Sequence, residues 1–459
     1  MSSRRDFLKC AGLALAPQRP KIPNIVFLFA DDLRFDTIHA LGNPEIRTPN
    51  LDGLARAGTA FTHAFIMGGT QGAVCVPSRA MLLTGQTLFR ADKDLIGKDA
   101  PERAVTFPEL FKQQGYVSFG IGKWHNNPRL FTRSFTGGEN VFFGGMSDQW
   151  KVPVADYDPS GEYPKQKRRT GAKFSSELFT DSAVRFLREY KGDKPFLLYV
   201  AYTAPHDPRT PPKEYLDMYP PEKIALPKSF LPEHPFDNGE MKIRDEQLAP
   251  WPRTPEVIRE HTAGYYGMIT SLDAQIGRIL KTLEETGRAG DTIVVFTGDN
   301  GLAVGRHGLM GKQNLYEHSV RVPLLMRGPG VPRGRTSGSF CYLLDLYPTL
   351  CALAGLTPPG SVEGKSLAPV LKDPRKQIRD TMFFAYRSVQ RAVRTERWKL
   401  ILYNVGGRRT TQLFDIRKDP WELNNLAAGA AQAGRVAELT ALLKKWMKET
   451  GDPLDLGTR

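Results

Sequence analysis

The chain has 459 residues, of which 41% are hydrophobic and 24% are charged, and its formal net charge is +14. This composition excludes a disordered or fibrous chain, and the length exceeds the roughly 250–300 residues of a single core, so we expect two domains or one large domain with an appendage. The excess of Lys and Arg indicates an anionic partner. Because zinc-finger spacing and aromatic RNA-binding motifs are missing, we expect no nucleic acid.

The N-terminus carries Arg4-Arg5 and then an apolar run that ends at Ala16, a pattern similar to a twin-arginine export signal. We therefore predict that residues 1–20 are an export signal and that the protein is periplasmic or secreted. No other stretch reaches the roughly 18–20 apolar residues of a membrane span, so we expect no stable membrane insertion.

Short apolar runs alternate with helical patterns along the next 300 residues, which predicts a large, mostly parallel (mixed) sheet flanked by helices. Thr106 and Glu109 form a capping box at one helix start, and a long amphipathic helix extends from about Ala263 to Thr286. The predicted strands are Ile25–Ala30, Val117–Ile121, Phe196–Tyr202 and Thr292–Phe296.

Polar clusters follow each of these strands. In chain order they are Asp31-Asp32, Gly122-Lys123-Trp124-His125, Pro205-His206 and Gly298-Asp299-Asn300. Each cluster alone is an ordinary turn, since Asp, Asn and Gly favour turns. Ligands of open α/β sheets bind beyond the carboxyl ends of the strands, so the four together favour one site at one edge.

This edge contains three carboxylates and one amide oxygen, from Asp31, Asp32, Asp299 and Asn300. Helix caps or turns would also explain one pair of these residues, but the whole set suits one Ca²⁺ per chain, with Mg²⁺ less favoured. The fixed positive charge around such a metal suits an oxyanion. It comes from Arg79, Lys123, His125, His206 and Lys312.

A distinctive motif lies between the first two strands, in Cys75-Val76-Pro77-Ser78-Arg79 and the apolar run to Gly85. Pro77 fits a first helical turn, so Cys75 would lie at the positive end of a helix with Arg79 one turn away. Such a position favours anions. A free cysteine by itself is more commonly a small buried side chain.

Beyond residue 372 the pattern changes to short strands typical of an antiparallel sheet, followed by a helix from about Val436 to Thr450. The strands are Phe383–Tyr386, Gln390–Val393, Trp398–Tyr403 and Gln412–Ile416. We predict a catalytic α/β domain at residues 21–372 and a smaller α+β subdomain at residues 373–459.

These segments together resemble the type I sulfatases of the alkaline-phosphatase superfamily, and the cysteine motif is the most specific part of the resemblance. In that family the cysteine is oxidised after synthesis to formylglycine, whose hydrate is the nucleophile. The other matching segments are Asn24–Asp32, Gly122–His125, Ala204–His206, Thr297–Gly301, Gly311–Lys312 and Leu413–Asp415.

The resemblance implies a role for each residue of the cluster. Arg79 would stabilise the formylglycine hydrate, and Lys123 and Lys312 would bind sulfate oxygens. His206 would protonate the leaving alcohol, and His125 would assist collapse of the sulfated intermediate. Calcium would be held by Asp31, Asp32, the modified Cys75, Asp299 and Asn300.

The expected function is hydrolysis of a sulfate monoester on a saccharide or small molecule, after maturation by a formylglycine-generating enzyme. Two alternatives remain: a phosphonate or phosphate ester hydrolase of the same superfamily, and an inactive sulfatase-like protein that binds sulfated glycans. The segments at 133–171 and 209–255 are expected to form the pocket rim, because loops set specificity on such scaffolds.

Overall fold

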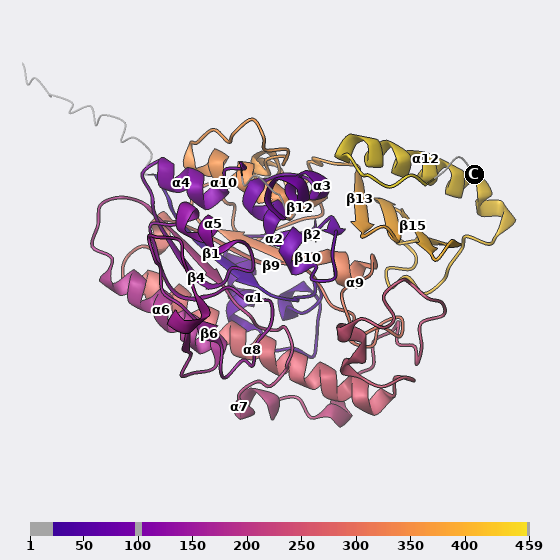
Figure 1. Cartoon of the computed structure of the whole chain (residues 1–459), viewed down its shortest axis with the longest axis horizontal. Coiled ribbons are helices and arrows are strands. Elements are labelled where there is room, and N and C mark those ends of the chain that lie inside the picture. The colour runs from indigo at the N-terminus through magenta and orange to yellow at the C-terminus, as the bar shows by residue number, and fades with distance from the viewer. Residues whose placement is uncertain (1–21, 97–102, 457–459) are drawn as a thin grey trace, which may run out of the picture.

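The computed structural model describes residues 22–96 and 103–456. The predicted export signal at residues 1–20 lies outside these ranges. Figure 1 shows a large α/β part and, beside it, a smaller C-terminal sheet crossed by one helix. Within the described ranges no helix is both long and apolar enough to cross a membrane.

The central sheet has nine strands in the order β11-β2-β10-β9-β1-β8-β4-β5, with β12 paired to β2. Five neighbours, β9, β1, β8, β4 and β5, run parallel, whereas β10 is antiparallel to β9 and β2. The strands are β1 (Asn24–Ala30), β2 (Thr59–Phe65), β4 (Val117–Lys123), β5 (Gly137–Phe142), β8 (Phe196–Ala201), β9 (Thr292–Gly298), β10 (Arg321–Arg327), β11 (Arg335–Ser337) and β12 (Cys341–Tyr342).

Helices cover both faces of this sheet because its strands are apolar on both sides. In β1, Ile25 and Phe27 face one core and Val26 and Leu28 face the other. The first core contains α2 (Cys75–Thr84), α4 (Phe107–Gln113) and α10 (Leu346–Ala354), and the second contains α1 (Pro49–Ala57), α6 (Ser175–Glu189) and α8 (Pro255–Glu285). Figure 1 shows the two helix layers above and below the sheet.

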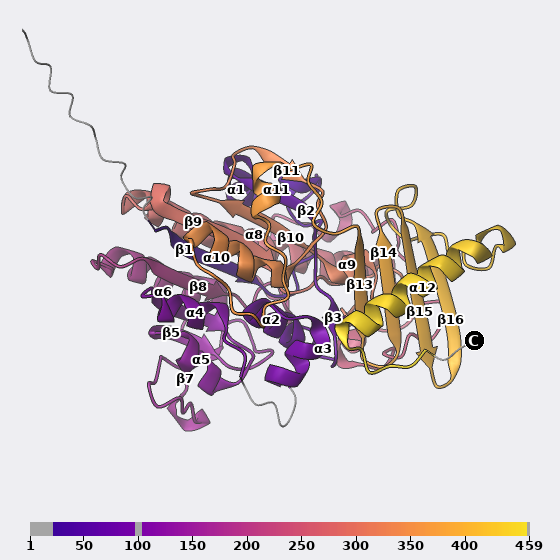
Figure 2. The ribbon, with the colours of Figure 1, turned by 90° about the horizontal axis from the view of Figure 1, so that it is seen from above.

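The C-terminal sheet has the order β16-β15-β14-β13-β3, in which β13 to β16 are antiparallel. Its fifth strand, β3 (Gly68–Gly69), comes from the segment just before α2 and pairs parallel to β13. Figure 2 shows this sheet edge against α2 and α3. The remaining elements are β13 (Thr381–Tyr386), β14 (Gln390–Thr395), β15 (Trp398–Val405), β16 (Arg408–Asp415) and α12 (Ala433–Thr450).

The predicted fold class is confirmed, and the four predicted strands of the central sheet all form. The boundary between residues 372 and 373 stays a prediction. Other short elements are α3 (Leu88–Ala91), α5 (Pro128–Ser134), β6 (Pro153–Val154), β7 (Arg169–Thr170), α7 (Lys213–Leu216), α9 (Glu317–Val320) and α11 (Ala368–Lys372).

The long helix begins earlier than the sequence pattern predicted. α8 starts at Pro255 rather than near Ala263, and the Thr254 side chain accepts a hydrogen bond from the amide of Val257. Proline in the first turn and a threonine N-cap are a favourable helix start. The apolar periodicity marked only the buried part of the helix, because much of its first two turns is exposed or half-buried.

Candidate active site

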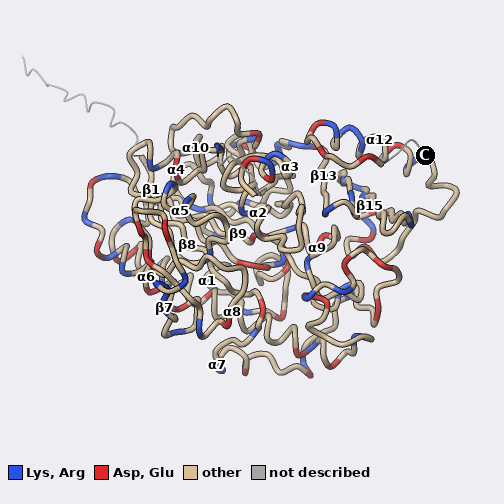
Figure 3. Tube along the Cα trace, in the orientation of Figure 1, with Lys and Arg blue, Asp and Glu red and all other residues tan. Residues whose placement is uncertain are grey.

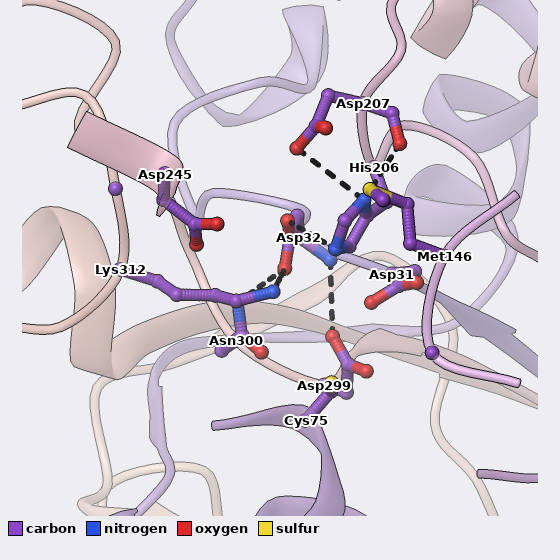
Figure 4. Close-up of polar contacts among 12 residues, drawn as sticks. Asp31, Asp32, Cys75, Met146, His206, Asp207, Asp245, Asp299, Asn300 and Lys312 are labelled. Carbon is purple, nitrogen blue, oxygen red and sulfur yellow. Dashed lines mark hydrogen bonds and ion pairs between the residues drawn. The ribbon is translucent and has the colours of Figure 1, made fainter. Parts of the chain in front are cut away.

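The two acidic pairs meet because β1 and β9 are adjacent and parallel, with Ala30 opposite Gly298. The chain after each strand therefore leaves the sheet at the same edge. The Asp32 amide donates to Oδ1 of Asp299 at 3.0 Å, and Nδ2 of Asn300 donates to Oδ1 of Asp32 at 2.7 Å. Figure 4 shows Asp31, Asp32, Asp299 and Asn300 converging on one centre.

Cys75 lies at the same centre, as the first residue of α2 and only 2% exposed. Its Sγ and carboxylate oxygens of Asp31 and Asp299 all lie within 4.8 Å of one another. Burial raises the pKa of the Cys75 thiol above its usual value, although Lys123 and Lys312 oppose the shift. The unmodified side chain is therefore a neutral thiol at neutral pH.

A cationic side chain contacts each aspartate of the cluster. Arg79 binds Asp299 through Nε at 2.9 Å, Lys123 binds Asp31, and Lys312 donates to Oδ1 of Asp32 at 2.6 Å. Burial lowers the pKa of Arg79 and of Lys312, but the neighbouring carboxylates outweigh it and raise both overall. These two cations thus stay charged despite their burial.

The two predicted histidines also lie at the cluster, next to Cys75 and Asp32. Nδ1 of His125 lies 3.2 Å from Sγ of Cys75. Nδ1 of His206 lies 2.8 Å from the carbonyl oxygen of Asp207, and its Nε2 lies 3.7 Å from Oδ2 of Asp32. Burial lowers the pKa of both rings, with Lys123 adding to the shift at His125 and Asp32 opposing it at His206.

The oxygen atoms of the cluster fit a hard dication. Oδ1 of Asp31, Oδ2 of Asp32 and Oδ1 of Asn300 are buried and lack a hydrogen-bond partner among the described residues. Burial and the charge of Asp31 raise the pKa of Asp299 to about 7, against the opposing effect of Arg79. Unsatisfied buried oxygens and crowded carboxylates are what Ca²⁺ or Mg²⁺ neutralises.

A cavity of about 420 Å³ opens above the cluster. Its volume lies within the roughly 300–1,000 Å³ range of small-molecule sites. Both segments predicted as a rim contribute, through Gly145 and Met146 and through residues 243–245. The lining residues are Gln71, Gly72, Ala73, Cys75, His125, Gly145, Met146, His206, Ile243, Arg244, Asp245, Lys312, Gln313 and Arg387.

Sequence reasoning missed several polar residues around this cavity. Arg244 contacts Asp207 and donates to Oδ1 of Asp245 at 2.7 Å, and Gln149 donates to the carbonyl of His206 at 2.9 Å. Arg387 reaches the cavity from the C-terminal sheet. The segments that carry Gln149 and Arg244 were predicted as rim, but the sequence held no signal for Arg387.

Comparison with known proteins gives two matching family models. One, described as Sulfatase, covers residues 23–356, and one, described as N-sulphoglucosamine sulphohydrolase, C-terminal, covers residues 305–450. N-acetylglucosamine-6-O-sulfatase of Bacteroides thetaiotaomicron is 28% identical over 97% of this chain and 91% of its own. Ulvan-active sulfatase of Formosa agariphila is 29% identical over 94% of this chain and 82% of its own.

Solved structures share the fold over nearly the whole chain. A protein in complex with its substrate D-glucosamine-2-N,6-O-disulfate superposes with a TM-score of 0.81 at 24% identity, covering 94% of this chain and 99% of that one. Phosphonate monoester hydrolase of Agrobacterium radiobacter superposes with a TM-score of 0.75 at 24% identity, covering 93% and 96%.

Proposed function

This chain belongs to the sulfatase family, and from that premise we propose that it hydrolyses a sulfate monoester of a sulfated saccharide with formylglycine formed from Cys75 and one bound Ca²⁺. As a sulfatase it is a sulfuric ester hydrolase. The observation that carries the proposal is the meeting of Cys75 with oxygens of Asp31 and Asp299 beneath an open cavity.

The state of the thiol supports its conversion. Burial raises the pKa of Cys75, and a neutral thiol is a poor nucleophile because the thiolate is the reactive form. Formylglycine at this position would supply a hydroxyl oxygen as nucleophile. Nδ1 of His125, 3.2 Å from Sγ, would accept a proton from such a hydroxyl.

The four strand-end residues Asp31, Asp32, Asp299 and Asn300 would hold the calcium ion, because their unsatisfied oxygens converge there. Bound calcium would act as a Lewis acid on oxygens of the reacting group. Arg79 holds Asp299 in place with a bond of 2.9 Å.

The cations and His206 act on the ester itself. Lys123 and Lys312 would bind sulfate oxygens. Each ammonium group contacts an aspartate of the metal cluster, so it would lie beside a sulfate bound at the metal. Nδ1 of His206 donates to the carbonyl of Asp207, so a proton for the leaving alcohol would come from Nε2 of the protonated ring. The charge of Asp32 favours that protonated form.

The substrate class rests on relatives and on charge. The two bacterial relatives carry the names of an N-acetylglucosamine-6-O-sulfatase and an ulvan-active sulfatase, and a net charge of +14 attracts anionic glycans. Figure 3 shows Lys and Arg interspersed with Asp and Glu along the described part of the trace. Maturation would require a formylglycine-generating enzyme, and residues 1–20 would direct export.

Phosphonate ester hydrolysis is the second candidate, because a phosphonate monoester hydrolase shares the fold with a TM-score of 0.75. Hydrolysis of an aryl sulfate, an aryl phosphate and an aryl phosphonate by the same preparation separates the two activities. A higher kcat/KM on either phosphorus ester than on the sulfate would favour this candidate. Negligible turnover of all three by converted protein would favour a glycan-binding role.

The deciding experiment compares protein produced with and without a formylglycine-generating enzyme, with conversion of Cys75 measured by peptide mass. We expect aryl sulfate turnover to rise with the converted fraction, and Cys75→Ala to lower it at least about 1,000-fold. Cys341→Ala is the matched control, since Cys341 is a free buried cysteine in β12. Turnover that is independent of conversion would refute the proposal.

A further inference from the structure

Arg387 enters the cavity from the other sheet. It follows β13 directly, and its backbone amide donates to the carbonyl of Gly69 in β3 at 2.8 Å. Its φ of +42° lies in the left-handed region, which a residue with a Cβ rarely adopts. Backbone strain of this kind is a reason to look for function at a residue.

Neighbouring residues hold the guanidinium group of Arg387 in position. Nη1 lies 2.6 Å from Oε1 of Glu240, which also accepts a hydrogen bond from the Tyr386 hydroxyl at 2.9 Å. On the Nη2 side of the guanidinium, Gly72 leaves room because it has no side chain: a Cβ there would lie 3.1 Å from Nη2 of Arg387. The side chain is thus held in place while 44% of it stays exposed.

Among the cations that line the cavity, Arg387 has the most free donor capacity. Lys312 contacts Asp32, and Arg244 is bound by the carboxylates of both Asp207 and Asp245. Within residues 22–96 and 103–456, by contrast, Nε and Nη2 of Arg387 have no hydrogen-bond partner, and Glu240 is its one carboxylate. A guanidinium with unused donors binds sulfate or carboxylate in a bidentate manner.

We infer that Arg387 is a specificity-determining residue that binds a second sulfate group on the saccharide whose sulfate ester is hydrolysed. This inference rests on the proposed function and narrows its substrate to saccharides with at least two negative charges. The C-terminal sheet then contributes to substrate choice, while the central sheet carries the chemistry.

The test measures a preference ratio in fully converted protein. Its substrates are monosulfated hexoses, each paired with the same hexose carrying a second sulfate. The preference ratio is the kcat/KM of the disulfated member divided by that of the monosulfated member. We expect the wild type to prefer a disulfated member and Arg387→Gln to reduce that ratio about 10- to 100-fold, mainly through KM. Arg387→Lys should retain part of it, because the charge remains.

Arg397→Gln is the matched control. Arg397 lies outside the cavity, is 45% exposed and contacts a single carboxylate, that of Asp415 at 2.8 Å, and its variant should keep the wild-type ratio. An Arg387→Gln ratio equal to that of the wild type would overturn the inference. A wild type that prefers the monosulfated member in every pair would also overturn the inference.

Calorimetric titration separates this inference from the proposed function. The same disulfated hexose is titrated into full-length protein whose Cys75 is unconverted, in the presence of calcium, so that binding is measured without turnover. Binding that weakens about 10-fold in Arg387→Gln supports the inference even if converted protein hydrolyses no sulfate. Binding that is indifferent to Arg387 contradicts it even if sulfatase activity is found.

Discussion

Arg79 and Asp299 form an ion pair from which solvent is excluded: Nε and Nη2 of Arg79 both lie 2.9 Å from Oδ2 of Asp299, and both side chains are 0% exposed. Nη1 of Arg79 also donates to the carbonyl of Lys123 at 2.8 Å. The arginine therefore joins the helix of Cys75 to the ends of β9 and β4, where Asp299 and Lys123 lie.

We expect Arg79→Ala to lower the free energy of unfolding by about 3–5 kcal/mol, because it leaves a buried carboxylate without its partner. Chemical denaturation measures the change. Arg90→Ala is the control, since Arg90 is 51% exposed and pairs with Glu363 at the surface, where such a pair contributes at most about 1 kcal/mol. Equal losses in the two variants would contradict the structural role of Arg79.

Calcium binding should depend on Asp299. Asp299→Asn keeps the size of the side chain but removes one negative charge from the oxygen cluster, so we expect calcium affinity to fall at least about 10-fold. Because a ligand that binds the native state raises its stability, the readout is the difference in melting temperature between calcium and a chelator. Asp273→Asn in α8 is the control, as Asp273 is also buried but binds the amides that begin α1. A calcium-dependent difference that Asp299→Asn leaves unchanged would remove Asp299 from the ligands.

The convergence of the candidate site residues could be predicted because the residues that follow parallel strands lie at the same edge of the sheet. Asp31, His125, His206 and Asp299 all follow neighbouring strands of the central sheet. The apolar pattern of the sequence predicts these strands, and the connections between parallel strands are right-handed. The carboxyl ends of the strands therefore lie at one edge, which brings together residues that are far apart in the sequence. The helix that presents Cys75 was likewise marked by Pro77 in its first turn.

The rim of the site could not be predicted in the same way. Arg387 reaches the cavity only because β13 pairs with the two-residue strand at Gly68–Gly69, and two glycines carry no strand signal. Glu240, which binds Arg387, lies in irregular structure, where the sequence has no helical or strand periodicity. Contacts between loops depend on tertiary packing, for which a single sequence holds no pattern.

The stability of the protein should fall in mild acid because of buried histidines. Burial lowers the pKa of His307 to about 3 and that of His234 to about 4. Unfolded histidines titrate near pH 6.5, so between that pH and about 4 the unfolded chain binds more protons than the folded chain. The free energy of unfolding then decreases as the pH falls, by up to about 1.4 kcal/mol per pH unit for each ring.

His307→Gln tests the histidine contribution, since the replacement does not titrate. Chemical denaturation at several values between pH 6.5 and 4 should give a shallower pH dependence for the variant than for the wild type. The slope is the readout rather than the stability itself, because His307 also stacks on Tyr316 with ring centroids 4.0 Å apart. Parallel pH profiles for the two proteins would show that His307 does not contribute.

The last prediction concerns Gly145, which lies between two residues of the site. Its carbonyl accepts a hydrogen bond from Nζ of Lys123 at 2.6 Å, and a Cβ on it would lie 2.6 Å from Cε1 and Nε2 of His125. A methyl group at this position must therefore displace the imidazole, which now lies 3.2 Å from Sγ of Cys75.

A displacement of about 1 Å of a catalytic group can cost about 100-fold in rate, so we expect Gly145→Ala to lower kcat about 10- to 100-fold on an aryl sulfate. Circular dichroism and the melting temperature should stay close to those of the wild type, because Gly145 lies in a half-buried loop outside the sheets. Gly360→Ala is the matched control, since a Cβ at Gly360 meets nothing within 4 Å. Wild-type kcat in Gly145→Ala would mean that the position of the His125 ring does not limit the reaction, and the proton-transfer role assigned to that ring would then have to be abandoned.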